Sequence, residues 1–427
     1  MIGVNGGSGV GRGGRGGARN VIVLIGDGMG HAHRLGGQLV SAGRYGRLAM
    51  DSLPYAGVMN TLSADPSLFV TDSAAAATAV ATGVKTSNGA ISVDLDGLPR
   101  TTILELARHA GKLTGLVTTC QVTDATPAAF AAHVPHRSDQ SEIARQYIEE
   151  TSVDVILGGG AAHWLPVGAE PLFSINLDLP GSAAEASRGN AGDLLRRAEE
   201  LGYVIATTPD SLRRAADDPE TTRLLGLFAN QELFRQFPEG RGDKYDPPVS
   251  LAELTASALA VLSRHDRGFF LMVEESAIDR MAHRNNAPLT LKGVIELDRA
   301  VSVAIAFAEQ LDDTLVVVTA DHECGGLAIA GSDDPPYPYE PGGGLLDGVL
   351  AGEDGPFPVL GTDQGFVMGW ATTGHTAASV PVTALGPGAE ALVGVYENTH
   401  LFDVLADALG VGPLIEQRFH RRSGFSD

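Results

Sequence analysis

Short apolar runs alternate with longer amphipathic stretches along most of this chain. Five runs rich in β-branched and aliphatic residues predict buried strands, at residues 21–25, 113–122, 153–157, 268–273 and 314–319. Five stretches with helical spacing predict helices, at residues 71–81, 101–112, 138–150, 250–264 and 289–311. Strands that alternate with helices of this length indicate an α/β fold, a three-layer sandwich in which helices cover both faces of a mostly parallel sheet.

The same pattern predicts how the chain is divided. Residues 1–19 are rich in glycine and arginine and contain no apolar segment of a secretory signal, so we expect a flexible tail there. Residues 20–427 show no linker and no evident repeat, which favours a single domain. Residues 331–361 are rich in proline, glycine and aspartate, and we expect them to form a small insertion on the surface of that domain.

Charge and hydropathy narrow the class of function. The chain of 427 residues has 44% hydrophobic residues, which is typical of a globular protein, and no apolar stretch reaches the ~18 residues of a membrane span. Its formal net charge of −22 disfavours nucleic acid as a partner, because clusters of Lys and Arg bind phosphate backbones. An acidic, Lys-poor composition is also compatible with a salt-rich (halophilic) habitat, which we keep as a hypothesis.

The two cysteines, Cys120 and Cys324, are too few for a disulfide framework. Cys120 lies in an apolar run and is typical of a core residue, whereas Cys324 follows a run of polar residues. The sequence leaves open whether the two cysteines pair with each other.

Acids, a histidine and a threonine follow four of the predicted strands. These residues are Asp27, Asp124, Thr126, Glu274, Asp321 and His322. Ligands of open α/β sheets bind beyond the carboxyl ends of the strands, so we expect these side chains to meet at one edge. Carboxylates gathered there would repel one another unless cations lay among them. Histidine with carboxylate favours zinc, and carboxylate with hydroxyl favours magnesium.

Two further patterns have both a functional and an ordinary structural interpretation. Asp279 and His283 are four residues apart, which suits chelation of one metal ion from a helix face, but also a solvated ion pair. Ser73 begins a predicted helix, where a serine is usually an N-cap. A helix N-terminus is also where backbone N–H groups stabilise a phosphate, so Ser73 is a candidate nucleophile.

Six segments together resemble the alkaline phosphatase family. They are VIVLIGDGMG at 21–30, TDSAAAATAVATG at 71–83, TDATPAAFAAHVPHR at 123–137, GFFLMVEESAIDRMAH at 268–283, LVVVTADHECGG at 315–326 and GHTAASVPV at 374–382. They occur in the family's order and span most of the chain, and this combination is far more specific than any one of them.

The resemblance implies a role for each matched residue. Ser73 would be the nucleophile, and Arg137 would clamp two phosphate oxygens with its planar fork. The implied ligands are Asp279, His283 and His375 for a first zinc ion, Asp27, Asp321 and His322 for a second, and Asp27, Thr126 and Glu274 for magnesium. Asp72, Asp124 and Arg280 would support these ligands or tune the grip on phosphate.

The implied activity is that of an alkaline phosphatase with two Zn²⁺ and one Mg²⁺, which hydrolyses phosphate monoesters through a phosphoserine and releases inorganic phosphate and an alcohol. The family also implies a crown-like insertion, a homodimer and a periplasmic or secreted location. Two alternatives stay open: a related phosphodiesterase, sulfatase or phosphomutase, and a non-catalytic protein that binds metal or phosphate. Thr126 with Glu274 supports the third metal and hence a monoester substrate.

The chain departs from the family pattern at two positions. Arg280 stands where members often carry Lys or His, and we expect it to tune phosphate binding or to pair with Asp124. Cys324 stands where many relatives have Thr; a thiolate there could bind zinc, although a buried cysteine is more often a small apolar residue.

Overall fold

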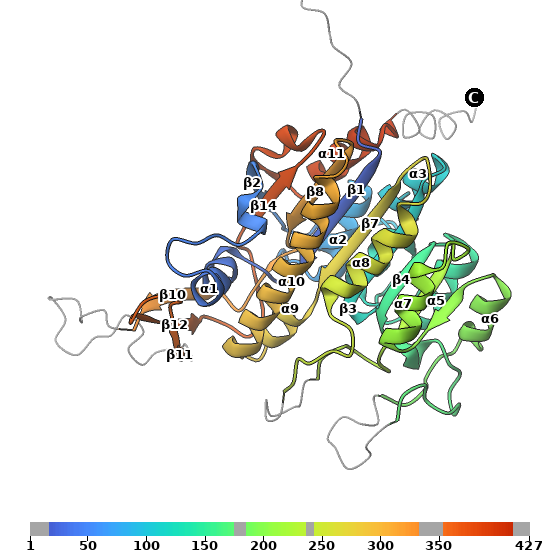
Figure 1. Cartoon of the computed structure of the whole chain (residues 1–427), viewed down its shortest axis with the longest axis horizontal. Coiled ribbons are helices and arrows are strands. Elements are labelled where there is room, and N and C mark those ends of the chain that lie inside the picture. The colour runs from blue at the N-terminus through green and yellow to red at the C-terminus, as the bar shows by residue number, and fades with distance from the viewer. Residues whose placement is uncertain (1–16, 175–184, 236–242, 333–352, 413–427) are drawn as a thin grey trace, which may run out of the picture.

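A ten-stranded sheet forms the centre of the molecule (Figure 1). The computed structural model describes residues 17–174, 185–235, 243–332 and 353–412. The strand order is β15-β2-β14-β8-β1-β7-β3-β4-β6-β5, and only β14 runs antiparallel to its neighbours. The strands are β1 (Asn20–Gly26), β2 (Tyr55–Asn60), β3 (Leu113–Gln121), β4 (Val155–Gly159), β5 (Val204–Ala206), β6 (Leu224–Leu227), β7 (Phe269–Glu275), β8 (Thr314–Thr319), β14 (Val380–Leu385) and β15 (Gly394–Glu397).

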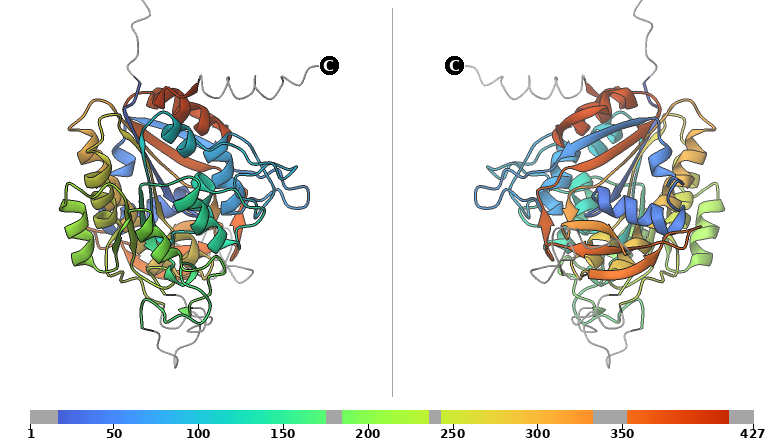
Figure 2. Two further views of the ribbon diagram at one scale, coloured as in Figure 1. Left: turned by 90° about the vertical axis from the view of Figure 1, so that its right-hand side faces the viewer. Right: turned by 90° about the vertical axis from the view of Figure 1, so that its left-hand side faces the viewer.

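Helices cover both faces of this sheet, as the side views show (Figure 2). Helices α8 and α10 pack on one face, and α3, α4 and α11 pack on the other, where α2 lies against α4 and α11. The helices are α1 (His31–Ser41), α2 (Ser73–Thr82), α3 (Ile103–His109), α4 (Ala125–Ala131), α5 (Gln140–Glu149), α6 (Leu194–Glu200), α7 (Pro209–Asp217), α8 (Leu251–Leu262), α9 (Ala277–Ala282), α10 (Ala287–Ala308) and α11 (Thr399–Leu409). The predicted three-layer α/β fold with a mostly parallel sheet is confirmed.

The predicted elements agree with the structure within a few residues, and they include the strand at 314–319, which is β8. The ends of the predicted helices shift by up to three residues. For example, α2 begins at Ser73 rather than at residue 71, and α3 ends at His109 rather than at residue 112. The sequence pattern did not assign helices α1, α6 and α7, nor α4 and the short α9. The last two are brief helices close behind strands, and segments this short show little helical periodicity.

Two predicted features fall largely outside the described residues. Residues 1–16 of the expected tail are among them, whereas Ala18 is buried and its N–H donates to the carbonyl of Ala408. Most of the expected insertion, residues 333–352, is also outside them. The flanking chain forms a small antiparallel sheet beside α1, made of β10 (Leu327–Gly331), β12 (Gly365–Trp370) and β11 (Glu353–Pro358).

The middle of the large sheet is buried on both faces, because every residue of β1 and of its neighbours β7 and β8 is buried. Register then brings the carboxyl ends of these strands together. Gly26 lies opposite Glu275, Ile25 opposite both Glu274 and Thr319, and Thr118 of β3 opposite Glu274. The residues that follow these positions therefore lie at a single edge of the sheet.

Among the described residues, no helix is long and apolar enough to cross a bilayer. Both cysteines are buried and carry free thiols. Cys120 and Cys324 therefore do not form a disulfide, which answers the question that the sequence left open.

Helix α8 provides a test of the local rules that shape this fold. Ser250 and Glu253 form the capping box that the sequence predicts, with Oγ of Ser250 accepting from the N–H of Glu253 at 3.2 Å. We expect Ser250→Ala to lower the unfolding free energy by about 1 kcal/mol. Ser263→Ala, at the other end of α8, is the matched control. Equal shifts of the urea midpoint in the two variants would contradict the capping role.

Candidate active site

Two groups of metal-binding side chains lie at the carboxyl edge of the sheet. Asp27, Asp321 and His322 form one group, and Asp279, His283, Cys324 and His375 form the other. Within each group the ligand atoms all lie within 4.8 Å of one another. The structure therefore brings together the residues that the sequence predicts for each of the two zinc ions.

The histidines of the second group are held in the orientation that a metal ligand needs. Nδ1 of His283 lies 2.6 Å from the carbonyl of Thr373, and Nδ1 of His375 lies 2.9 Å from the carbonyl of Thr71. Because a carbonyl only accepts hydrogen bonds, each Nδ1 carries a proton, and Nε2 is the nitrogen left to bind a metal. The two Nε2 atoms face each other at 3.1 Å, and that of His283 lies 3.2 Å from Oδ2 of Asp279.

Short elements bring this second group together. Asp279 lies in α9, and His283 directly follows that six-residue helix, so the predicted spacing on one helical turn is observed. His375 lies opposite Cys324 where the short strand β13 (His375–Thr376) pairs with β9 (Glu323–Cys324). Directly paired residues of antiparallel strands share one face, which brings the Cys324 thiol near the ligands. The thiol contacts the carbonyl of Asp279 at 3.8 Å.

The first group lies next to the hydroxyl of Ser73, which His322 contacts. His322 is fully buried, and its Nε2 lies 3.1 Å from Oγ of Ser73, 3.2 Å from Oδ2 of Asp321 and 3.5 Å from Oδ1 of Asp27. Asp27 follows β1, while Asp321 and His322 follow the neighbouring strand β8. Adjacent parallel strands thus supply all three ligands.

Ser73 is the first residue of α2 and is not its cap. Asp72 is the N-cap, and its Oδ1 accepts from the N–H of Ala75 at 3.0 Å. The capping interpretation of Ser73 is therefore wrong. Its hydroxyl is left at the N-terminus of a ten-residue helix, where backbone N–H groups and the helix dipole favour an anion.

A third set of oxygen ligands lies beside the first group. Oε2 of Glu274 accepts from the hydroxyl of Thr118 at 2.5 Å, and the buried Thr126 of α4 also lies beside Glu274. Asp27 is close enough to Glu274 for the two charges to repel. Thr126, Glu274 and Asp27 are the residues that the sequence predicts for magnesium, and all three are buried here.

Two arginines flank Asp124, next to this set. Nη2 of Arg137 lies 2.9 Å from Oδ1 of Asp124, and Nη2 of Arg280 lies 2.5 Å from Oδ2. Burial alone would raise the pKa of Asp124, but Arg280 and Arg137 hold it well below its usual range. Nη1 of Arg137 also contacts Oδ2 of Asp72 at 3.2 Å. The predicted pairing of Arg280 with Asp124 is thus present.

The carboxylates of the site need cations. Burial, and then repulsion by Asp279, Asp321 and Glu274, raises the pKa of Asp27, while burial raises that of Glu274 to about 8 and that of Asp321 to about 6. Within the part of the chain that the structure describes, Oδ1 of Asp27, Oδ1 of Asp279 and Oδ2 of Asp321 accept no hydrogen bond although they are buried. Lone pairs of this kind, mixed with imidazole nitrogens, fit divalent metal ions.

Comparison with known proteins agrees with this geometry. The family model described as alkaline phosphatase matches residues 18–337. The chain belongs to the alkaline phosphatase family. Among its relatives, it is 32% identical to alkaline phosphatase 4 of Bacillus subtilis, over 92% of this chain and 89% of the relative, and 36% identical to streptomycin-6-phosphate phosphatase of Streptomyces griseus, over 92% and 91%.

Solved structures lead to the same family. The alkaline phosphatase of Thermus thermophilus superposes with a TM-score of 0.74 at 28% identity, over 93% of this chain and 92% of that chain. The alkaline phosphatase of the Antarctic bacterium TAB5 superposes with a TM-score of 0.71 at 29% identity, over 92% and 98%. The protein is accordingly a phosphoric monoester hydrolase.

Sequence reasoning missed the groups that orient the ligands of this phosphatase site. Thr118 lies inside β3, in what looks like an ordinary apolar strand, and the carbonyls of Thr71 and Thr373 carry no side-chain signal. Only the parallel register of β3 and β7, which sets Thr118 opposite Glu274, would have pointed to the threonine.

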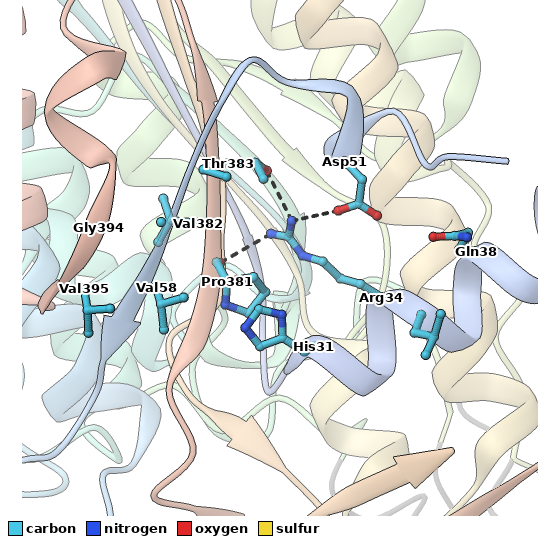
Figure 3. Close-up of a pocket in the computed structure, with 13 residues that line it drawn as sticks. His31, Arg34, Gln38, Asp51, Val58, Pro381, Val382, Thr383, Gly394 and Val395 are labelled. Carbon is cyan, nitrogen blue, oxygen red and sulfur yellow. Dashed lines mark hydrogen bonds and ion pairs between the residues drawn. The ribbon is translucent and has the colours of Figure 1, made fainter. Parts of the chain in front are cut away.

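An open cavity of about 500 Å³ lies away from the active site of this phosphatase, beside α1, β2 and β14 (Figure 3). Arg34 lines it, and its guanidinium donates to Oδ1 of Asp51 at 3.3 Å and to Oγ1 of Thr383 at 3.2 Å. Neither Ser73 nor any of the metal-binding side chains is among the 13 residues that line this cavity. The charge of Arg34 is balanced by Asp51. The cavity is not part of the active site.

The raised pKa values predict how the metal-free protein responds to pH. Unfolded Asp and Glu titrate near about 4. Because folding raises the pKa of Asp27, Asp321 and Glu274, these three carboxyls bind more protons in the folded protein than in the unfolded chain between pH 4 and about 8. Their contribution to the unfolding free energy therefore falls as pH rises through that range. Thermal unfolding of chelator-treated protein at several pH values would measure this fall. Metal-replete protein should show it far less, and parallel profiles would contradict the prediction.

Proposed function

We propose that this phosphatase hydrolyses phosphate monoesters through a phosphoserine on Ser73, with two Zn²⁺ and one Mg²⁺ as its resident metals. The observation that carries the proposal is the position of the Ser73 hydroxyl, 3.1 Å from Nε2 of His322 and at the N-terminus of α2. A nucleophile activated beside a metal and a site for the phosphoryl anion therefore coincide.

The donor sets fit the three metals. Asp279, His283 and His375 would hold the first zinc, and Asp27, Asp321 and His322 the second. Asp27, Thr126 and Glu274 would hold magnesium, which prefers oxygen ligands. When bound, the metals would lower the pKa of the serine hydroxyl and neutralise charge on the transferring phosphoryl group. A variant of the TAB5 alkaline phosphatase with Mg bound in its M3 site supports a third site in this fold.

The chain's own residues would do the remaining work. Oγ of Ser73 would lose its proton and bond to phosphorus as the P–O bond to the alcohol breaks, and the alcohol would take up a proton as it leaves. Water would then hydrolyse the phosphoserine, which releases inorganic phosphate and restores the hydroxyl of Ser73. Arg137 offers the planar fork that suits two phosphate oxygens, and its two contacts with Asp72 and Asp124 hold that fork in place before substrate arrives. Arg280, fixed by Asp124, keeps a positive charge beside the incoming dianion.

We also propose the quaternary state, location and habitat that the sequence suggests: a homodimer, exported to the periplasm or secreted, and adapted to salt. Family membership supports the first two, and the net charge of −22 supports the third. Sedimentation of the purified protein with and without salt tests the dimer and the salt requirement together. A monomer that is stable and active in salt-free buffer would refute both.

Replacing the nucleophile separates this proposal from its alternatives. We expect Ser73→Ala to reduce kcat for p-nitrophenyl phosphate at alkaline pH by about a thousandfold or more, because no phosphoserine can form. Metal analysis should find zinc and magnesium in both proteins, since Ser73 is not needed to hold either ion. The control variant is Ser63→Ala. The hydroxyl of Ser63 donates to the carbonyl of Leu68 in an exposed loop.

Two outcomes would overturn the proposal. Undiminished turnover in the Ser73→Ala variant would remove the serine from the mechanism. A metal-replete parent that hydrolyses bis(p-nitrophenyl) phosphate but not the monoester would make the protein a diesterase.

A further inference from the structure

Glu275 is a buried carboxyl that none of the roles above uses. It ends β7, directly after Glu274, and is fully buried. Oε1 accepts from Oγ1 of Thr119 at 2.9 Å and from the N–H of Ala277 at 3.0 Å, and Oε2 accepts from the hydroxyl of Tyr245 at 2.5 Å. Burying a carboxyl costs free energy unless it is hydrogen-bonded, and three donors satisfy Glu275 here.

Tyr245 reaches Glu275 from the segment between β6 and α8, and its ring is fixed on two sides. Phe234 packs against it edge-on, with ring centroids 6.0 Å apart, and Nζ of Lys292 lies 5.5 Å from the ring centroid. Phe234 and Tyr245 also form a buried cluster with Ala277 and Met281 of α9. A ring held in this way presents its hydroxyl to Glu275 in one direction.

The N-terminus of helix α9 is capped by Glu275 rather than by the residue at the N-cap position. Ser276 occupies the N-cap position but makes no capping hydrogen bond, and its hydroxyl instead points to Oδ2 of Asp27 at 3.4 Å. Glu275 takes the free N–H of Ala277 in its place. The N–H of Ser276 donates to Oγ1 of Thr119, which in turn donates to Glu275.

Glu275 is therefore bonded to two of the segments that carry metal ligands. Its side chain holds the first turn of α9, which contains Asp279, and its backbone carbonyl accepts from the N–H of Asp27 at 3.1 Å. We propose that Glu275, held by Tyr245, is a positioning residue that fixes Asp27 and Asp279 relative to each other. The inference rests on the proposed function only in that these two aspartates bind zinc.

Zinc affinity is the property that this role should change. Removing a group that orients metal ligands typically weakens metal binding by about 10- to 100-fold. We expect Tyr245→Phe, which removes one of the three donors, to raise the zinc dissociation constant by about tenfold. It would be measured by competition with a chromophoric chelator on the full-length protein.

The matched control is Tyr203→Phe. Tyr203 is also a buried tyrosine, and its hydroxyl donates to the carbonyl of Val153 at 2.5 Å, near the edge strand β5. Both variants lose one buried hydroxyl, so a merely structural role predicts similar losses of Tm and no difference in zinc affinity. We expect a weaker zinc complex in Tyr245→Phe alone. Glu275→Gln, which keeps the size of the side chain and one acceptor oxygen, provides the second test should Tyr245→Phe fail to fold.

The outcomes separate this inference from the proposed function. Equal zinc affinity in the parent and in the Tyr245→Phe and Glu275→Gln variants would overturn the positioning role and leave the zinc enzyme intact. A parent that binds no zinc in the same titration would overturn both.

Discussion

Repulsion among buried carboxylates is the constraint around which this active site is built. Asp27, Glu274, Asp279 and Asp321 all lie at the carboxyl edge of one sheet, and burial raises the pKa of three of them, while histidines hold that of Asp279 low despite its burial. The fold cannot relieve the repulsion by moving these groups apart, because register fixes the strand ends that carry them. Positive charge has to be brought in, and divalent metals supply it in the most compact form.

The positive side chains of the site have a different task. Arg137 and Arg280 both contact Asp124, the N-cap residue of α4. Asp124 thereby fixes two guanidinium groups, and Arg137 also contacts Asp72, the residue before Ser73. A protein with a net charge of −22 can bind a phosphate dianion only where positive charge is concentrated locally in this manner.

Most of the positions of the acidic ligands could be predicted from the sequence. The strands are visible as apolar runs, and the acids follow these runs directly. Asp27 and Asp321 are examples in which the strand and its polar end are adjacent in sequence. What could not be predicted depends on contacts between distant segments. The carbonyl of Thr71 orients His375 from 304 residues away, and Tyr245 reaches Glu275 from a loop with no regular pattern. The role of Asp72 as N-cap was also missed, because Ser73 has an equally good capping side chain.

The backbone also connects the two groups of metal-binding side chains. Gly28 follows Asp27 with φ +70°, a conformation that side chains disfavour, and its N–H donates to Oδ1 of Asp321 at 3.1 Å. A Cβ at this position would lie 2.9 Å from both Oδ1 of Asp279 and the Cβ of Cys324. The turn that delivers one ligand therefore packs directly against the segments that deliver the others. A side chain at this position would force the turn and those segments apart.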